Sequence, residues 1–289
     1  MVIPCRTIAR VIETHLKKEV QQLKKKGKAP LLTTFLVGES AEQLSFVAIK
    51  KKLAEKLGIK FDFIHIKRTP SFEVFAHILK DKAHNPNVTG ILIQQPLPPL
   101  LQTDSVYNFI PLQKEIEGHK LKSPFSPPIG LATLTLLKHI FGKGKIDEQI
   151  IVDLEKDKVF FKNSLKHKKI VIAGRGLTGG QPIGKCFSQL KINYLSLNSK
   201  TYNPEEYYRD ADIIITTTGK KILKAENIKP GAILINIGLR KEEGILKGDY
   251  DEKEVDKIAS YYSQTPGGLG PIDVLYLFNN VIEAAKLQK

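Results

Sequence analysis

The chain has little of what disulfide frameworks, metal clusters and membrane spans require. It contains two cysteines, one methionine and no tryptophan among 289 residues. Cys5 and Cys186 fit neither a zinc-ligand spacing nor a disulfide framework. None of the seven histidines pairs with another at metal spacing, so we interpret them as structural or solvated and expect no metal. No run of about 18 apolar residues occurs, and the first residues lack the pattern of a secretory signal. These absences predict a cytoplasmic protein without a membrane span.

Acidic residues are also scarce relative to basic ones. Lys and Arg total 45 against 30 Asp and Glu, which gives a formal net charge of +15. Such a balance attracts nucleic acids or small anionic ligands. The lysines are spread over helix-forming segments in short clusters, which is typical of solvated helix faces, and no nucleic-acid-binding motif accompanies them. We therefore expect small anions rather than nucleic acid as partners. The length predicts two domains at about 150 residues each.

The first third of the sequence alternates between helical and extended apolar patterns. Helices are predicted over 6–27, 41–57 and 71–84, and strands over 31–37, 61–66 and 88–93. Ser40 with Gln43 forms a capping-box signature at the start of the second helix, and Gly58 ends it. The third strand runs into Gln94, Gln95 and Pro96, where clustered prolines must end it. Open α/β sheets bind ligands at such carboxyl ends, so this loop is a candidate site.

The second half has a different organisation. Residues 118–130 are rich in Pro and Gly and are predicted to link two domains. A helix is expected over about 130–141, while 142–167 carries no assignable pattern. Strands over 168–174, 192–197, 211–218 and 231–238 then alternate with helices over 182–190 and 202–209, which implies a parallel sheet. The last helix, 272–287, should pack back on the first domain. We thus predict an α/β fold with domains 1–122, completed by 271–289, and 123–270.

A glycine-rich turn follows the first strand of the second domain. Gly174, Gly176 and Gly179 match G-x-G-x-x-G, and Gly180 comes next. The pattern leaves a strand and opens a helix, the context in which it binds the pyrophosphate of a dinucleotide. The helix N-terminus supplies unpaired N–H groups and partial positive charge. The alternative is an ordinary glycine-rich turn.

The residues about 20 positions further on bear on which dinucleotide is bound. An NAD site would carry Asp or Glu there to hold the ribose 2′-hydroxyl, but this chain has no acid over 198–201. Ser199 and Lys200, together with Arg175, suit a 2′-phosphate instead. The sequence therefore favours NADP over NAD. The alternative is a solvated turn at 198–201.

Two further pairs of residues have roles that the sequence pattern alone leaves open. Phe46 and Lys50 lie four residues apart on one face of the second predicted helix. Because Lys50 precedes two more lysines, the pattern alone favours a surface position. Glu115 and Glu117 are compatible with a carboxylate site or with a polar loop.

Taken together, six stretches resemble the bifunctional methylenetetrahydrofolate dehydrogenase/methenyltetrahydrofolate cyclohydrolase family. They occur in the family's order, from a VGxxxAxxxYxxxK-like helix through GILVQLPLP-, KDVDG-, GRSxxVGxP- and HSKT-like segments to a TPVPGGVGPMT-like loop. In this chain they occupy residues 37–50, 90–98, 114–118, 174–182, 198–201 and 263–273.

The resemblance implies a folate domain and a Rossmann-type, doubly wound NADP-binding domain that face each other across a cleft. It implies oxidation of 5,10-methylenetetrahydrofolate with NADP, hydrolysis of the methenyl product to 10-formyltetrahydrofolate, and a homodimer. Lys50 would be the key cyclohydrolase residue, Gln94 would orient it, and Glu117 would hold the pterin ring. The implied folate-lining residues are Phe46, Gln95, Pro96, Pro266, Gly267, Gly268, Leu269 and Gly270. The implied cofactor residues are Gly174, Arg175, Gly176, Gly179, Gly180, Ser199 and Leu239, of which Arg175 and Ser199 would take the 2′-phosphate.

The chain departs from the family pattern at several of these positions. Phe46 stands where the family has tyrosine, Glu117 where it has aspartate, and Gly176 where it has serine. Ile272 and Asp273 replace Met-Thr, and about 142–165 is an insertion. Three functions therefore remain open: the bifunctional enzyme, a dehydrogenase without the hydrolase activity or with another substrate, and a non-catalytic folate- or NADP-binding relative.

Overall fold

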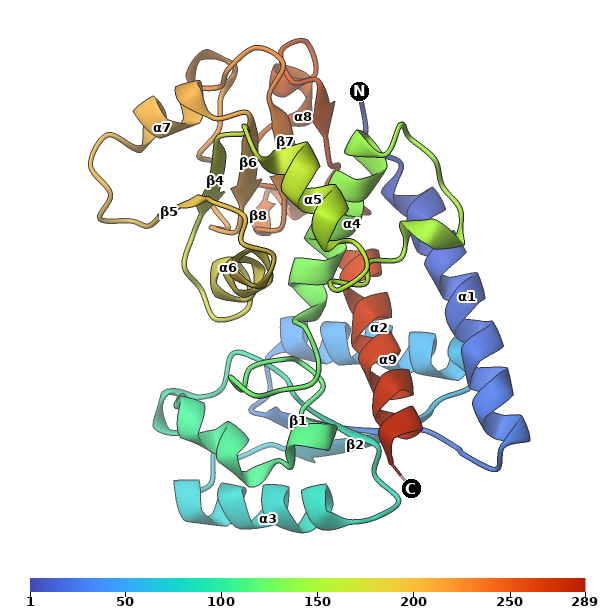
Figure 1. Cartoon of the computed structure of the whole chain (residues 1–289). Coiled ribbons are helices and arrows are strands. Elements are labelled where there is room, and N and C mark those ends of the chain that lie inside the picture. The colour runs from blue at the N-terminus through green and yellow to red at the C-terminus, as the bar shows by residue number, and fades with distance from the viewer. Residues whose placement is uncertain (289) are drawn as a thin grey trace. The chain divides into compact units, whose positions relative to one another are not determined.

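The computed structural model describes residues 1–288, which pack as two compact units (Figure 1). The three-stranded unit comprises Glu13–Pro128 and the stretch from Val274 onward. The five-stranded unit comprises Met1–Ile12 and Ile129–Asp273. Each unit has its own parallel sheet, which confirms the predicted α/β class.

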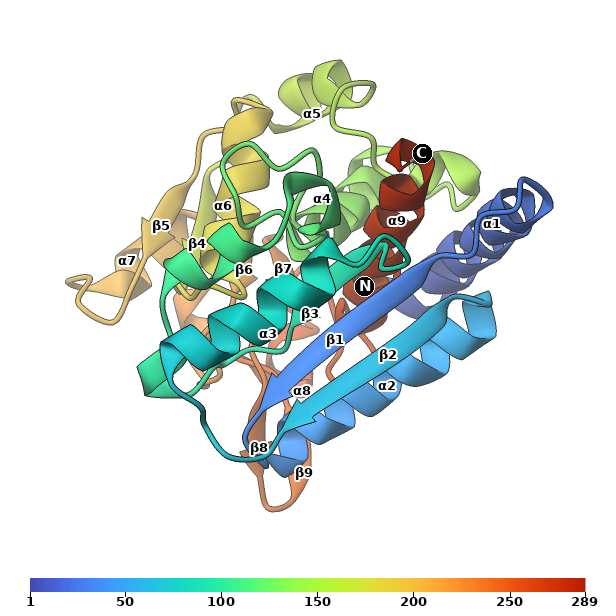
Figure 2. The ribbon, with the colours of Figure 1, turned by 90° about the horizontal axis from the view of Figure 1, so that it is seen from below.

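The sheet of the three-stranded unit has the order β2-β1-β3. Its strands are β1 (Leu31–Val37), β2 (Lys60–Ile66) and β3 (Gly90–Ile93), all parallel. Helices α2 (Ala41–Leu57) and α3 (Phe72–His84) connect them and cover opposite faces (Figure 2). β1 and β3 are almost wholly buried, as continuous apolar strands of a parallel sheet must be, whereas β2 is a half-exposed edge strand.

The ends of α2 show why the sequence signals there are informative. The hydroxyl of Ser40 accepts from the N–H of Gln43 at 3.3 Å, and Gly58 adopts the left-handed conformation at φ 78°. A capping box also predicts a hydrogen bond from the Gln43 side chain back to the backbone of Ser40, and this part of the prediction is wrong. The side chain of Gln43 does not turn back to Ser40 but donates to the carbonyl of Pro96 at 2.7 Å. α2 therefore fixes the loop that follows β3.

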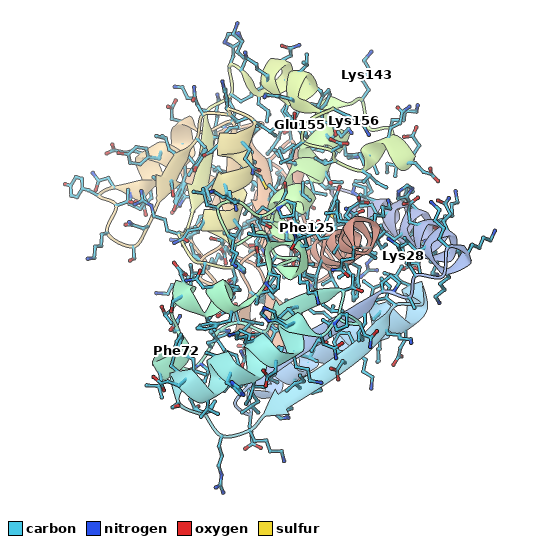
Figure 3. The ribbon with its side chains drawn as sticks, turned by 60° about the horizontal axis from the view of Figure 1, so that its bottom comes forward. Lys28, Phe72, Phe125, Lys143, Glu155 and Lys156 are labelled. Atoms are coloured by element: carbon cyan, nitrogen blue, oxygen red, sulfur yellow. The ribbon has the colours of Figure 1, made fainter. Side chains whose placement is uncertain are left out.

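Ion pairs and hydrogen bonds join segments of the three-stranded unit that are distant in sequence. Glu13 and Glu19, on α1 (Cys5–Lys25), pair with Lys56 of α2 at 2.7 Å and with Lys286 of α9 (Gly270–Leu287) at 2.5 Å. Lys28 caps the carboxyl end of α9 by donating to the carbonyls of Ala285 and two other residues there (Figure 3). A cation is favourable at this end of a helix dipole. From Val274 onward, the carboxyl-terminal helix thus belongs to the three-stranded unit.

Three short 3₁₀ helices lead from β3 toward the end of this unit. They are η1 (Pro99–Leu101), η2 (Asp104–Phe109) and η3 (Leu112–Lys114). The ring of Phe72, at the start of α3, packs on Phe109 at 6.0 Å between centroids (Figure 3). Beyond η3, Glu115 pairs with Ile91 as an isolated parallel bridge, which places the 115–118 segment beside β3.

The five-stranded unit contains a parallel sheet of order β10-β7-β6-β4-β5. Its strands are β4 (Ile170–Ala173), β5 (Leu195–Leu197), β6 (Ile213–Thr216), β7 (Ile233–Asn236) and β10 (Tyr261–Tyr262). The chain proceeds from β4 outward to β5 and then returns to the other side of β4 as β6. The crevice between β4 and β6 is thus the topological switch point at which doubly wound sheets bind dinucleotides.

The helices of this unit are α4 (Pro128–Phe141), α5 (Lys158–Leu165), α6 (Gly180–Gln189), α7 (Pro204–Asp210) and α8 (Glu252–Val255). α4 and α6 pack closely, because a Cβ on Gly130 would lie 2.3 Å from the Cys186 sulfur. Short turns η4 (Glu148–Ile150) and η5 (Ala225–Asn227) and a hairpin of β8 (Arg240–Glu242) and β9 (Ile245–Lys247) complete it. The segment around 142–165 holds η4 and α5, tied to α4 by the Lys138–Asp157 ion pair at 2.7 Å.

Val2 forms a parallel bridge with Tyr262, so the first residues extend the five-stranded sheet. No pattern in the sequence predicts this pairing. Within residues 1–288, no helix is long and apolar enough to cross a membrane. The same residues contain no group of three or more His, Cys, Asp or Glu side chains arranged to hold a metal ion.

Candidate functional site

Lys50 and Gln94 meet at the carboxyl end of the three-stranded sheet. The ammonium of Lys50 donates to Oε1 of Gln94 at 2.8 Å, and Nε2 of Gln94 donates to the carbonyl of Gln95 at 2.9 Å. These two partners fix the orientation of the amide, since its oxygen must face the ammonium. Gln94 is buried and Lys50 half-buried, one helical turn beyond the half-buried ring of Phe46. The structure therefore brings together the two side chains that the resemblance pairs.

The loop after β3 is held on both sides. Gln95 donates from Nε2 to the hydroxyl of Tyr107 at 3.0 Å, and its Oε1 accepts from the N–H of Leu97 at 3.0 Å. The carbonyl of Pro96 accepts from Gln43, as described above. These hydrogen bonds restrain the loop after β3, which is the loop that the sequence predicts to be a ligand site.

Glu115 and Glu117 have different environments. Glu115 is buried, and its carboxyl accepts from the N–H of Glu117 at 3.0 Å and from the N–H of Lys120 at 3.2 Å. Burial raises the pKa of Glu115, and the charge of His119 opposes that rise. Glu117 is half-buried, with its Oε2 3.7 Å from Nε2 of His119. Glu115 thus organises the loop, whereas the side chain of Glu117 remains partly exposed.

A residue of α9 holds the same loop from the other side. Nδ2 of Asn280 donates to the carbonyls of Ile116 at 2.8 Å and Ser126 at 3.0 Å, and the side chain is 4% exposed. The position of Glu117 therefore depends on a residue more than 160 positions later in the chain.

The glycine-rich turn of the five-stranded unit lies at the switch point. Gly174 has φ 111°, and a Cβ there would lie 2.2 Å from the hydroxyl oxygen of Thr217, beyond β6. A Cβ on Gly180 would lie 1.8 Å from the carbonyl of Gly174, and one on Gly179 2.8 Å from Cβ of Thr217. Gly176 faces open space. Three of the four glycines are therefore needed for the close packing of the turn against Thr217 and against itself, and α6 begins directly at Gly180.

Arg175 and Ser199 follow neighbouring strands, β4 and β5, at the same edge of the sheet. The guanidinium of Arg175 donates from Nε to the hydroxyl of Ser196 at 3.1 Å and from Nη2 to its carbonyl at 2.5 Å. Ser199 and Lys200 are exposed in a turn closed by Asn198 and Thr201. Arg175 is thus held on β5, close to the turn on which Ser199 lies.

A buried polar network connects the far ends of β6 and β7 with the loop before α9. Oδ1 of Asn236 accepts from Thr216 and from the N–H of Asp249, and its Nδ2 donates to Gly238 and Thr265 at 2.8 Å each. Asp249 accepts from the N–H of Thr218 at 2.7 Å. This network orders the segment before the exposed Leu239 and the loop that continues to Gly270.

Comparisons with known proteins agree with this architecture. The family model for the tetrahydrofolate dehydrogenase/cyclohydrolase catalytic domain matches residues 3–117, and the model for its NAD(P)-binding domain matches 152–289. The bifunctional protein FolD of Staphylococcus epidermidis is 33% identical over 98% of this chain and 95% of its own length. That of Staphylococcus carnosus is 32% identical with the same coverage.

The chain belongs to the tetrahydrofolate dehydrogenase/cyclohydrolase family. Among solved structures of the family, the bifunctional FolD enzyme from Campylobacter jejuni is 28% identical, with a TM-score of 0.87 over 100% of this chain and 99% of that one. A methylenetetrahydrofolate dehydrogenase from the silkworm Bombyx mori is 27% identical, with a TM-score of 0.81 over 97% and 96%. The family resemblance inferred from six motifs is confirmed.

Several residues that shape these sites were not predicted as site residues from the sequence. Gln43, Tyr107 and Asn280 fix the loops that carry Gln94, Gln95 and Glu117, but each lies in a different element from the residue it supports. Asn236 is the comparable case in the five-stranded unit. For Asn236 and Asn280, an amide inside an apolar stretch was the available signal, since a buried amide requires hydrogen-bond partners.

Proposed function

We propose that this protein oxidises 5,10-methylenetetrahydrofolate to 5,10-methenyltetrahydrofolate with NADP and hydrolyses the methenyl form to 10-formyltetrahydrofolate. The observation that carries this proposal is the 2.8 Å contact between Lys50 and Gln94 at the carboxyl end of the three-stranded sheet. It occurs in a chain that aligns over 98% of its length with curated bifunctional relatives.

The turn at 174–180 suits a dinucleotide. The space that a Cβ would fill at Gly176 is open, while the neighbouring glycines bring the backbone close to β6. α6 begins at Gly180, directly after this turn, so the positive end of its helix dipole lies beside the turn, which is favourable for a pyrophosphate. Arg175 and Ser199, together with the absence of an acid over 198–201, favour NADP over NAD. When bound, NADP supplies a hydride acceptor.

The oxidation step makes few chemical demands on the protein. A hydride leaves the methylene carbon, and no proton has to be transferred to a side chain. Alignment of the reacting carbon therefore dominates, and effective positioning lowers the barrier without an acid or base. We assign this positioning to Glu117 at the pterin ring and to the Gln94–Pro96 loop.

Hydrolysis of the methenyl product has different requirements. Water adds to a cationic carbon, a proton is lost, and a C–N bond then breaks as its nitrogen gains a proton. A positioned donor and acceptor contributes about 10²–10⁴-fold in such a step. Lys50 is the basic side chain that contacts Gln94, whose Oε1 accepts from its Nζ at 2.8 Å. We therefore assign the proton transfers to Lys50 and the orientation to Gln94.

A dehydrogenase without hydrolase activity is the second candidate. The observation that favours it is Phe46, whose ring lacks the hydroxyl of the family's tyrosine one turn before Lys50. An absorbance assay with 5,10-methylenetetrahydrofolate and NADP separates the candidates. The bifunctional enzyme forms NADPH without lasting methenyl accumulation, whereas a dehydrogenase alone accumulates the methenyl form. Formation of no NADPH would contradict both.

We further propose a cytoplasmic homodimer. In the three-stranded unit, β2 has an unpaired outer edge, with Phe63 exposed on it. Edge strands of this kind are ready for pairing with a second chain. Light scattering with size-exclusion chromatography should give a mass near twice 32.4 kDa. A monomer at micromolar concentration would contradict this part of the proposal.

A further inference from the structure

His119 lies beside the carboxylate that we assign to the pterin ring. Its Nε2 is 3.7 Å from Oε2 of Glu117, and both side chains are 20% exposed. Its ring lies on the ring of Tyr107, with centroids 4.3 Å apart and planes tilted by 31°. The histidine is therefore held between an aromatic ring and an acid, in agreement with the structural one of the two interpretations that the sequence left open.

The loop around His119 is constrained by its own backbone. Glu115 accepts from the N–H groups of Glu117 and Lys120, on either side of the histidine. Gly118 has φ 73°, and a Cβ there would lie 2.7 Å from the carbonyl of Phe125. The imidazole consequently has a fixed anchor from which to act on Glu117.

Tyr107 connects this corner to the other end of the site. Its hydroxyl accepts from Nε2 of Gln95 at 3.0 Å, next to the amide that holds Lys50. Burial and the charge of Glu117 raise the pKa of Tyr107, so it remains a neutral phenol. The chain of contacts from Glu117 through His119 and Tyr107 therefore ends at Gln95.

We propose that His119 is a positioning residue that holds the Glu117 carboxylate in its folate-binding position, most strongly when the imidazole is protonated. This inference rests on the proposed function. Glu117 is one methylene longer than the family's aspartate, and each added torsion gives a side chain more conformations to lose on binding. The imidazolium restricts the longer side chain by charge and contact, while its ring stays seated on Tyr107.

The charges around His119 determine the direction of the pH effect. The titratable and charged groups that face this corner are Glu115, Glu117, Tyr107, Asp104 and Lys120. Three are acids and one is a phenol, and the ammonium of Lys120 is directed to the carbonyl of Ile110 at 2.6 Å. A proton on His119 is thus balanced by nearby carboxyl groups. Because histidine ordinarily changes charge between pH 5 and 8, folate affinity should fall as pH rises through that range.

The test is the dissociation constant of tetrahydrofolate, measured anaerobically by calorimetry at pH 6.5, 7.5 and 8.5. Wild type should bind roughly three- to tenfold more weakly at pH 8.5 than at pH 6.5, as expected for a partly exposed charged contact. His119→Phe keeps a ring on Tyr107 without the charge, and should bind weakly with no pH dependence. His77→Gln, which removes an exposed histidine beside Asp81 on α3, is the matched control and should behave as wild type.

A double variant removes both partners of the contact, and the KM for NADP reports whether each variant is still folded. Glu117→Asp/His119→Phe shortens the acid and removes its partner, and should also lose the pH dependence. The KM for NADP should stay within about twofold in every variant. A pH-independent wild type, or a His119→Phe protein with the wild-type slope and affinity, would overturn the inference alone. A wild type that neither binds tetrahydrofolate nor forms NADPH would overturn the proposed function and the inference with it.

Discussion

Asn280→Leu is the substitution for which the structure gives the clearest expected magnitude. Nδ2 of Asn280 donates to the carbonyls of Ile116 and Ser126 in a site where the side chain is 4% exposed. Leucine keeps the approximate volume but leaves both carbonyls without this partner. Each buried unsatisfied carbonyl costs about 1–3 kcal/mol, and the added apolar burial returns part of this. We expect a net loss of about 2–4 kcal/mol in the free energy of unfolding.

The same change should affect folate binding, because Ile116 directly precedes Glu117. We expect the KM for 5,10-methylenetetrahydrofolate to rise and the KM for NADP to stay unchanged. Urea unfolding followed by circular dichroism gives the stability, and initial rates of NADPH formation give the two constants. Asn279→Ala, on the neighbouring position of α9, is the control. If Asn280→Leu unfolds within about 0.5 kcal/mol of wild type, or if both constants rise equally, the assigned role of Asn280 is refuted.

Three further predictions concern the glycine turn, the buried acid and the aromatic residue. Gly176→Ser should fit the open space and lower the KM for NADP about tenfold through a charge-assisted hydrogen bond, whereas Gly180→Ala should destroy cofactor binding by its clash with a carbonyl; equal effects on the KM would contradict the turn geometry. Burial raises the pKa of Glu115 in the folded state, so the wild-type protein loses stability as pH rises above 4.5 and this carboxyl group ionises. Glu115→Gln has no such group and should therefore gain stability relative to wild type over that pH range; a pH-independent difference in melting temperature would argue against it. Phe46→Tyr should raise cyclohydrolase activity about 3–10-fold by restoring one hydrogen bond, and a large fall would show that the pocket has repacked around phenylalanine.

The elements that sequence patterns predicted well are those whose signals are local. α2 occupies 41–57 as predicted, because Ser40 caps its first turn and Gly58 ends it. Continuous apolar runs placed the strands of the parallel sheets, although each run is longer than the hydrogen-bonded strand within it. The strand expected over 211–218, for example, is β6 at Ile213–Thr216. The helix expected from 182 begins at Gly180, since the glycine turn itself forms its first residues.

The parts that the sequence did not predict depend on contacts between distant segments. The segment near 142–165 has no clear periodicity, yet α5 forms there because Phe161 and Leu165 become buried and Asp157 pairs with Lys138. The bridge from Val2 to Tyr262 joins the ends of the five-stranded unit across 260 positions. The candidate site shows the same limit. Motifs place Lys50, Gln94 and Glu117 individually, whereas only tertiary structure shows what holds each side chain.

The most direct test of the central claim is a comparison of Lys50→Met with wild type in both half-reactions. Methionine keeps the length of the side chain and removes the ammonium that donates to Gln94. NADPH formation from 5,10-methylenetetrahydrofolate should persist within a few-fold, while hydrolysis of added methenyltetrahydrofolate should fall by about 10²–10⁴. The methenyl absorbance should then accumulate during turnover. Hydrolysis at the wild-type rate would contradict the account, because Lys50 would then be no more than a helix residue beside Gln94.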